Sequence, residues 1–300
     1  MDRDPANPAV WFPLEANPVV LTTLAQKWGL APHIHFEDVL GLDPETLSLV
    51  TRPVHAVVAL FPDTPGIVAA RTDEGPGEAD AAAAAHVAVV VPPAVTPIPP
   101  SPLSQTSSSP PLPSHVSHPS PLRGAEDTLT ADVGLASSSA APVQSAGAGS
   151  SSSSAPRVPL WIPQVNVGHA CGTFAVVHAL AATGLAPGLD EFVAQCRALP
   201  PSKRTDLFRS SSLIHDAHNS VVAAGQSTPR PEDWDDCDHF IVFVPYDGTL
   251  WELDGVAPRQ GPFNRGVCED VLADTARVIR DKYLPVAGES IHFALLALVG

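Results

Sequence analysis

The sequence predicts a mixed α/β protein whose folded part is interrupted by a long segment rich in Pro, Ser and Ala. Three observations predict this class. Residues 54–62 form a continuous apolar run typical of a strand that is buried on both faces. Residues 239–254 have the pattern of a β-hairpin around the turn dipeptide Asp247-Gly248. Residues 172–184 are apolar on all sides and end in glycine, which predicts a buried helix.

The chain is predicted to contain one discontinuous folded domain, formed by residues 8–62 and 158–300, and an insert between the two parts. Residues 63–157 contain no phenylalanine, tyrosine or tryptophan, and they are dominated by Pro, Ser and Ala. Such a composition cannot bury enough apolar surface to offset the entropy of the chain. We therefore predict that residues 63–157 are disordered, and that deletion of residues 68–155 leaves the activity of the folded domain intact.

The first folded part is predicted to contain two helices before the strand at residues 54–62. Asn17 is a good N-cap, it is followed by proline, and Gly29 ends the helical pattern that begins there. A second, short helix is expected from Asp43 to Leu49. Between the two helices, the partly alternating sequence IHFEDVLGL predicts a short edge strand.

The second folded part is predicted to continue with a helix at residues 189–199. Residues 200–238 are polar and favour loops, except for a probable helix pattern at residues 213–224. After the hairpin, residues 267–283 have the apolar stripe of an amphipathic helix. The closing sequence HFALLALV predicts another buried strand.

Composition excludes some classes of protein. Lys plus Arg number 16 against 32 for Asp plus Glu, a formal net charge of −16, so we expect no binding to nucleic acid. The four cysteines form no C-x-x-C pair, which favours free thiols in a reducing compartment. The N-terminal sequence lacks the features of a signal peptide, and the most apolar stretch, residues 81–95, is too short to span a membrane. We expect a cytoplasmic protein that is monomeric and does not bind membranes.

Cys171 lies where irregular sequence meets the predicted buried helix. Pro163, Asn166 and Gly168 interrupt any regular pattern before it. A thiol at a helix start faces the positive end of the helix dipole, which favours the thiolate, the form of cysteine that acts as a nucleophile. Taken alone, a cysteine at this place is more often a small buried side chain of the core. Its interpretation therefore depends on partners elsewhere in the chain.

His239 and Asp254 are candidate partners, because the predicted hairpin brings them together. With Asp247 and Gly248 at the tip, residues 240 and 255 are opposite each other, so His239 and Asp254 are diagonal neighbours. A carboxylate at this distance orients the imidazole and leaves its second nitrogen for a thiol. A cysteine at a helix start, followed later by His and Asp on adjacent strands, is the chain order of papain-like cysteine hydrolases.

A zinc site is the alternative use of the same region. His169, Cys171, Cys237 and His239 are a permitted set of zinc ligands. Each pair is separated by one residue, however, whereas structural zinc sites usually have two to four residues between paired ligands. The spacing therefore favours nucleophilic catalysis over metal binding, and we expect no metal ion and no organic cofactor.

Long motifs in both folded parts resemble the ubiquitin carboxy-terminal hydrolases, a family of papain-like cysteine proteases. The resemblance is carried by WFPLEANPVV, FEDVLGLDPETLSLVTRPVHAVVALFP, GHACGTFAVVHALA, AHNSVVAAGQS, DHFIVFVPYDGTLWELDG and FALLALV. It implies that Cys171 is the nucleophile, that His239 is the general base and acid, and that Asp254 orients His239. It also implies helices around a central antiparallel sheet with a knotted backbone, and ubiquitin, bound through its C-terminal tail, as the partner.

The sequence departs from the family pattern at the residue that stabilises the oxyanion. The family places a glutamine six residues before the nucleophile, but this position is Val165, and Gln164 stands one residue earlier. Three explanations are open: a local bulge brings Gln164 to the site, backbone N–H groups serve alone, or the gene model is shifted at the end of the insert. Loss of one oxyanion donor typically costs about 10²–10³ in rate.

The resemblance also suggests how the substrate is selected. Residues 202–238 correspond to the loop that crosses the active site in this family, so we expect a mobile lid that admits small or unfolded adducts of ubiquitin. The acidic run at residues 233–238, together with Glu15, suits a basic ubiquitin tail. The expected function is removal of small adducts or peptides from the C-terminal glycine of ubiquitin, in ubiquitin-dependent protein catabolism. The alternative is a catalytically weak protein of the same fold that binds ubiquitin.

Overall fold

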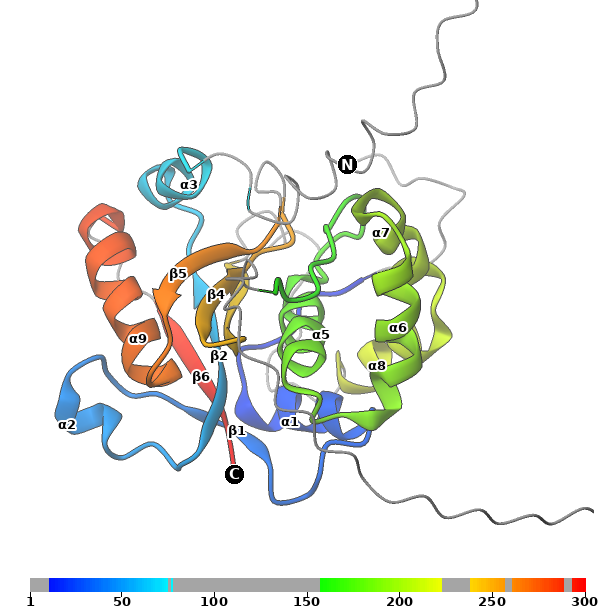
Figure 1. Ribbon diagram of the computed structural model, residues 1–300, viewed down its shortest axis with the longest axis horizontal. Helices are drawn as coiled ribbons and strands as arrows, with labels where there is room; N and C mark the ends of the chain where they lie inside the picture. Colours follow the sequence, from blue (N-terminus) through cyan, green and yellow to red (C-terminus); the bar gives the residue numbers. More distant parts are fainter. Residues whose placement is uncertain (1–10, 75–76, 78–156, 223–237, 257–260, 289–292) are drawn as a thin grey trace, which may run out of the picture. The chain divides into compact units, whose positions relative to one another are not determined.

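A central antiparallel sheet of six strands organises the part of the chain that the computed structural model describes, residues 11–74, 77, 157–222, 238–256, 261–288 and 293–300 (Figure 1). The strands are β1 (His35–Asp38), β2 (Val54–Phe61), β3 (His239–Tyr246), β4 (Thr249–Leu253), β5 (Phe263–Val267) and β6 (Ala294–Val299). Their order across the sheet is β1-β6-β2-β3-β4-β5, and all neighbours are antiparallel. The predicted fold class, helices around a central antiparallel sheet, is confirmed.

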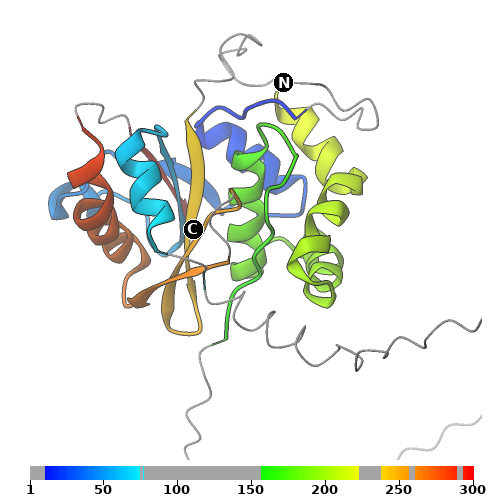
Figure 2. The same cartoon turned by 90° about the horizontal axis from the view of Figure 1, so that it is seen from above.

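Helices cover both faces of the sheet (Figures 1 and 2). The α-helices are α1 (Pro18–Gln26), α2 (Pro44–Leu47), α3 (Pro65–Thr72), α5 (Cys171–Thr183), α6 (Asp190–Ala198), α7 (Pro201–Ser210), α8 (Ser212–Val222) and α9 (Val271–Val278). Short helical turns follow at η1 (Pro187–Leu189), η3 (Ile279–Tyr283) and η4 (Leu284–Val286). Helices α1, α5, α6, α7 and α8 lie on one side of the sheet, whereas α2, α3 and α9 lie on the other. Within the described residues, no single helix is long and apolar enough to cross a membrane; α5 and residues 187–198 reach that length and composition only together, across a bend of 102°.

The central strands separate two apolar cores, because successive side chains of a strand point to opposite faces. In β3, Val242 and Val244 belong to the core that contains α5, which we call the first core. Ile241 and Phe243 belong to the core that contains α9, the second core. This burial on both faces explains why the strand sequence is apolar without a break.

The β3–β4 hairpin has the predicted turn and register. Asp247 and Gly248 both have left-handed backbone conformations, with φ of 51° and 74°, as a type I′ turn requires. Tyr246 pairs with Thr249, and the pairing continues without a shift to the end of β4. The hairpin therefore fixes which residues meet at its open end.

Two local predictions are wrong, and one strand was missed. Residues 201–210 form α7 rather than a loop: the helix is polar, but its Phe208 ring stacks on Phe174 of α5 with centroids 3.9 Å apart, and this packing outweighs weak helix propensity. Strand β5 was not predicted, because only Phe263 of its five residues is buried. The following helix begins at residue 271 rather than 267, since Asp270 is its N-cap.

The predicted insert starts too early in the sequence. Residues 65–72 form α3, which begins after Thr64, whose hydroxyl accepts a hydrogen bond from the Ile67 N–H. Ile67 and Arg71 of this helix are buried. Residues 63–74 therefore fold with the domain and are not disordered. Residues 78–156 of the predicted insert lie outside the described residues. Because the path of the chain through this segment is not described, the knotted backbone stays a prediction.

Candidate active site

Cys171 is the first residue of α5, as the sequence predicts. The helix packs against β3, is buried from Gly172 to Leu180, and ends at Gly184 in a left-handed conformation. Cys171 itself is half-buried and is a free thiol. The N-terminal end of a buried helix places positive partial charge next to this sulfur.

His239 and Asp254 meet at the open end of the β3–β4 hairpin. The Nε2 atom of His239 and the Oδ1 atom of Asp254 are 2.9 Å apart, and both side chains are buried. Strand pairing places Val242 opposite Leu253, so His239 and Asp254 are the diagonal neighbours that the turn predicts. Since Nε2 contacts the carboxylate, Nδ1 is the nitrogen left for the thiol.

Neighbouring groups raise the pKa of His239. Burial lowers this pKa, but the charge of Asp254, the hydrogen bond that its carboxylate accepts, and a hydrogen bond and charge interaction with Cys171 together raise it to about 9. The imidazole is therefore an imidazolium at neutral pH. A thiol, an imidazole and a carboxylate in this arrangement are the groups that a cysteine hydrolase uses for nucleophilic attack and proton transfer.

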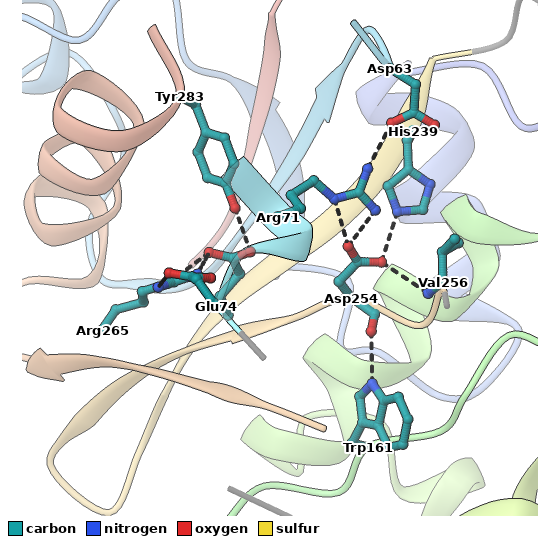
Figure 3. A network of polar contacts seen from close by, with 10 residues as sticks. Asp63, Arg71, Glu74, Trp161, His239, Asp254, Val256, Arg265 and Tyr283 are labelled. Carbon is teal, nitrogen blue, oxygen red and sulfur yellow. Dashed lines mark hydrogen bonds and ion pairs between the residues drawn. The ribbon is translucent and has the colours of Figure 1, made fainter. Parts of the chain in front are cut away.

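The Asp254 carboxylate is held from several sides (Figure 3). Its Oδ1 accepts the backbone N–H of Val256 at 3.0 Å in addition to the contact with His239, and its backbone carbonyl accepts the indole N–H of Trp161 at 2.7 Å. Its Oδ2 accepts Nε of Arg71 at 2.9 Å and also Nη2 of the same guanidinium. Asp254, the residue after β4, is therefore held by side chains from β3, from α3 and from the segment before α5.

Arg71 is a site residue that sequence reasoning missed. It lies on α3, in the stretch whose composition predicts the start of a disordered insert. The available signal was Thr64 followed by Pro65, an N-cap with proline at the first helical position. No feature of the sequence shows that this short helix returns to the open end of the hairpin.

A second buried ion network lies beside the first, two residues earlier on β4. Glu252 is fully buried; Arg265 donates to it from Nε at 2.8 Å, and the Tyr283 hydroxyl donates to it at 2.6 Å. Glu74 accepts two hydrogen bonds from Arg265, at 2.6 and 2.8 Å, and pairs with Lys282. Burial raises the pKa of Glu74, but the hydrogen bonds and charges of Arg265 and Lys282 hold it at about 2. We call these five residues the Glu252 network.

Gln164 lies against the loop that follows Asp254. Its backbone N–H donates to the carbonyl of Gly255 at 2.6 Å, and its side-chain amide donates to the carbonyl of Gly168 at 2.8 Å. Val165, which stands at the family's glutamine position, is 47% exposed. The structure thus turns Gln164, not Val165, toward the protein, but the role of Gln164 as an oxyanion donor stays a prediction.

Three further histidine and cysteine side chains, outside the triad, have environments that do not activate them. His178 is buried in α5, its Nε2 accepts the N–H of Ile162 at 2.9 Å, and burial lowers its pKa to about 4. Burial raises the pKa of both Cys196 and Cys268 to about 11, so neither thiol is activated. Among the described residues, no three His, Cys, Asp or Glu side chains are arranged to hold a metal ion, and Cys237 of the zinc alternative lies outside this part of the chain.

The predicted lid is only partly described. Residues 201–210 and 212–222 form α7 and α8, so the first half of residues 202–238 is helical and is not a loop. Residues 223–237, which include most of the acidic run, lie outside the described residues. The crossing of the active site and the acidic surface for a basic tail stay predictions.

Comparisons of sequence identify relatives over nearly the whole chain. The family model of ubiquitin carboxyl-terminal hydrolase, family 1, matches residues 11–89 and 135–283. Ubiquitin carboxyl-terminal hydrolase 3 of Arabidopsis thaliana is 27% identical over 297 residues, which covers 96% of this chain and 93% of that protein. Ubiquitin carboxyl-terminal hydrolase isozyme L1 of Bos taurus is 29% identical, with 95% and 97% covered.

Two solved structures are similar to this protein in fold. The catalytic domain of Trichinella spiralis UCH37, solved bound to ubiquitin vinyl methyl ester, superposes with a TM-score of 0.59 at 16% identity and covers 99% of both chains. A second UCH37 structure superposes with a TM-score of 0.53 and covers 96% of this chain and 81% of that one. With the family model matching most of its length, the chain belongs to the ubiquitin carboxyl-terminal hydrolases, the cysteine-type deubiquitinating enzymes.

Proposed function

We propose that Cys171, His239 and Asp254 are the catalytic triad of this deubiquitinating enzyme. One observation carries the proposal: a free thiol at the start of α5 contributes to the raised pKa of an imidazole whose Nε2 lies 2.9 Å from a fully buried carboxylate. The three side chains come from α5, β3 and the end of β4, so packing of the sheet against α5 assembles them.

The chemistry follows from these positions. The Cys171 thiolate attacks the carbonyl carbon of the C-terminal glycine of ubiquitin, and electrons of the C=O bond move to the oxygen. When the tetrahedral intermediate collapses, the bond to the leaving amine breaks, and the proton of the His239 imidazolium passes to that amine. A thioester between ubiquitin and Cys171 remains.

Water completes the turnover. Neutral His239 removes a proton from a water molecule, which attacks the thioester carbonyl. The C–S bond then breaks, and free ubiquitin, the thiolate and the imidazolium are restored. Asp254 keeps the imidazole in one orientation throughout, and no metal or organic cofactor takes part in these steps.

The substrate class in this proposal is ubiquitin joined through its C-terminal tail. The relatives are named as ubiquitin carboxyl-terminal hydrolases, and the UCH37 structures hold ubiquitin vinyl methyl ester. The net charge of −16 is compatible with a basic tail. The preference for small adducts rests on the family resemblance alone, because residues 223–237 lie outside the described part.

Hydrolysis of ubiquitin that carries a fluorogenic amine on its C-terminal glycine tests the proposal. We expect Cys171→Ala to lower kcat on the order of 10⁴-fold or more, as removal of other catalytic nucleophiles does. Cys268→Ala is the matched control, since Cys268 is also a half-buried thiol, and it should retain activity. A wild-type protein that binds ubiquitin without turnover would contradict the triad and support a binding protein instead.

A further inference from the structure

Arg71 contacts the oxygen of Asp254 that His239 leaves free. The two carboxylate oxygens of Asp254 have different partners: Oδ1 faces His239, whereas Oδ2 faces Nε and Nη2 of Arg71 (Figure 3). The Arg71 side chain is 6% exposed, and that of Asp254 is fully buried. Two N–H groups of one buried guanidinium on the same carboxylate oxygen are a strong, charge-assisted contact that fixes the position of Oδ2.

A second carboxylate holds Arg71 from the outside. Nη1 of Arg71 donates to Oδ1 of Asp63 at 2.7 Å, and the Asp63 side chain is 47% exposed. The four groups Asp63, Arg71, Asp254 and His239 therefore form a row of alternating charge from the surface to the imidazole. Arg71 and Asp254, the two charges in the middle of the row, each have an opposite charge on both sides, which is the arrangement that makes burial of an ion tolerable.

Helix α3, which carries Arg71, packs closely against η4. At Gly66, an added Cβ would lie 2.1 Å from the carbonyl oxygen of Val286, so α3 approaches the backbone of η4 as only glycine permits. Ile67 is fully buried in the second core, and the guanidinium of Arg71 lies 5.6 Å from the centre of the Phe61 ring. The position of Arg71 is thus determined by packing, not by the ion pair alone.

We propose that Arg71 is a positioning residue for the reaction: it fixes the orientation of the Asp254 carboxylate that holds His239 toward Cys171, and Asp63 holds Arg71 in turn. The inference rests on the proposed triad and adds to it a positioning residue on α3. Without Arg71, the carboxylate keeps its contacts through Oδ1 but can rotate about them, and its negative charge is balanced by His239 alone.

The charged groups around His239 predict how its pKa changes when the charge of Arg71 is removed. Asp254 and Cys171 raise the pKa of His239, and Arg71 reaches it through Asp254. His178, also close to Asp254, is held neutral at pH 7 by burial and adds no charge there. Removal of the positive charge of Arg71 should therefore strengthen the hold of Asp254 on the imidazolium and move the titration of His239 to higher pH.

Arg71→Met is the primary variant, and Arg265→Met is its control. Arg265 is also a buried arginine paired with a carboxylate of β4, but its partner is Glu252 and not the triad residue. In hydrolysis of the fluorogenic ubiquitin amide, we expect Arg71→Met to lower kcat by about 10- to 100-fold with KM unchanged, the effect typical of a lost orienting partner. Arg265→Met should lower thermal stability while the folded enzyme keeps kcat within about twofold of wild type.

Two further measurements separate orientation from a purely structural role. The pKa of the His239 imidazole, followed by NMR in the folded protein without ubiquitin, should shift upward in Arg71→Met, on the order of one pH unit. Arg71→Lys keeps the charge but not the fork, so it should restore the wild-type titration of His239 and only part of kcat. In an Asp254→Asn background, Arg71→Met should change kcat less than about twofold further, because it acts through Asp254.

The outcomes are distinct. Loss of stability in Arg71→Met with an unchanged kcat and an unchanged His239 titration would overturn the inference, and so would full multiplication of the two losses in the double variant. Because the titration of His239 does not depend on the substrate, a wild-type protein that fails to cleave ubiquitin would refute the proposed function and leave the test of Arg71 intact.

Discussion

Gln164 donates its backbone N–H to the carbonyl oxygen of Gly255 at 2.6 Å, so the loop that precedes the nucleophile is joined to the loop that follows Asp254. Residue 164 also forms an isolated parallel bridge with Val256, whose N–H donates to Asp254. The two loops that border the site therefore cannot move independently. A change at this junction should affect the triad before it affects the rest of the fold.

Gly255→Ala tests the junction. A Cβ at residue 255 would lie 3.1 Å from Cβ of Gln164 and 3.3 Å from the carbonyl oxygen of Ile162, closer than ordinary packing allows. We expect a loss of about 1–3 kcal/mol in the free energy of unfolding, typical of overpacking, and a fall in kcat. Urea denaturation and amide hydrolysis measure the two effects.

Gly248→Ala is the control for this change. Gly248 has a φ of 74° at the tip of the same hairpin, far along the strands from the site, so alanine there is strained without a steric contact. It should lower stability by about 1–3 kcal/mol and leave kcat unchanged. Equal effects of the two variants on kcat would show that the junction has no special role.

The raised pKa of His239 makes stability and activity depend on pH. Its pKa rises from 6.5 to about 9 in the folded protein, where burial lowers it but Asp254 and Cys171 raise it more. The stabilisation is fully present below about pH 6.5 and is lost as the pH rises through about 9. Over the same range, kcat/KM should fall as the imidazolium loses its proton.

His239→Gln removes this dependence. The difference in the free energy of unfolding between wild type and His239→Gln should shrink as the pH rises from about 6.5 to about 9. Urea denaturation at several pH values measures it. A difference that stays constant across this range would mean that the imidazolium is not stabilised by the fold.

The Glu252 network should contribute to stability rather than to chemistry. Arg265→Met removes the guanidinium from a fully buried carboxylate, and breaking such a pair costs about 3–5 kcal/mol in the free energy of unfolding. Arg277→Met is a matched control, because its pair with Asp274 is exposed; the cost there should be below about 1 kcal/mol. Similar losses in both variants would contradict a special role of the buried pair.

The boundary of the insert can be tested by two deletions. Replacement of residues 79–155 by a short Gly/Ser linker keeps α3 and the residues of both ion networks, so we expect kcat close to wild type. A deletion from residue 68 to 155 also removes Arg71 and Glu74 and should reduce activity at least as much as Arg71→Met. If both deletions were equally active, α3 would have no part in the site.

Features that depend on local sequence were predictable. The Asp247-Gly248 turn sets the register of β3 and β4, and with it the approach of His239 to Asp254, because pairing in a hairpin follows from its turn. The glycine at residue 184 and the apolar run before it placed Cys171 at a helix start in the same way.

Features that depend on tertiary contacts could not be predicted from the sequence. Arg71 reaches Asp254 across 183 residues of sequence, and α3 is short and lies beside a low-complexity segment, so its composition resembles that of the insert. Helix α7 is polar and is stabilised by the stacking of Phe208 on Phe174. Strand β5 is an edge strand with one buried residue, and such strands carry little apolar signal.

The reaction of the folded protein with ubiquitin vinyl methyl ester tests the central claim most directly, because it requires the fold, the ubiquitin site and the nucleophile together. We predict one ubiquitin bound covalently per protein, with the modified residue mapped by mass spectrometry to Cys171, and no reaction in Cys171→Ala. No reaction of the folded wild-type protein, or modification of Cys196 or Cys268 instead, would contradict the account.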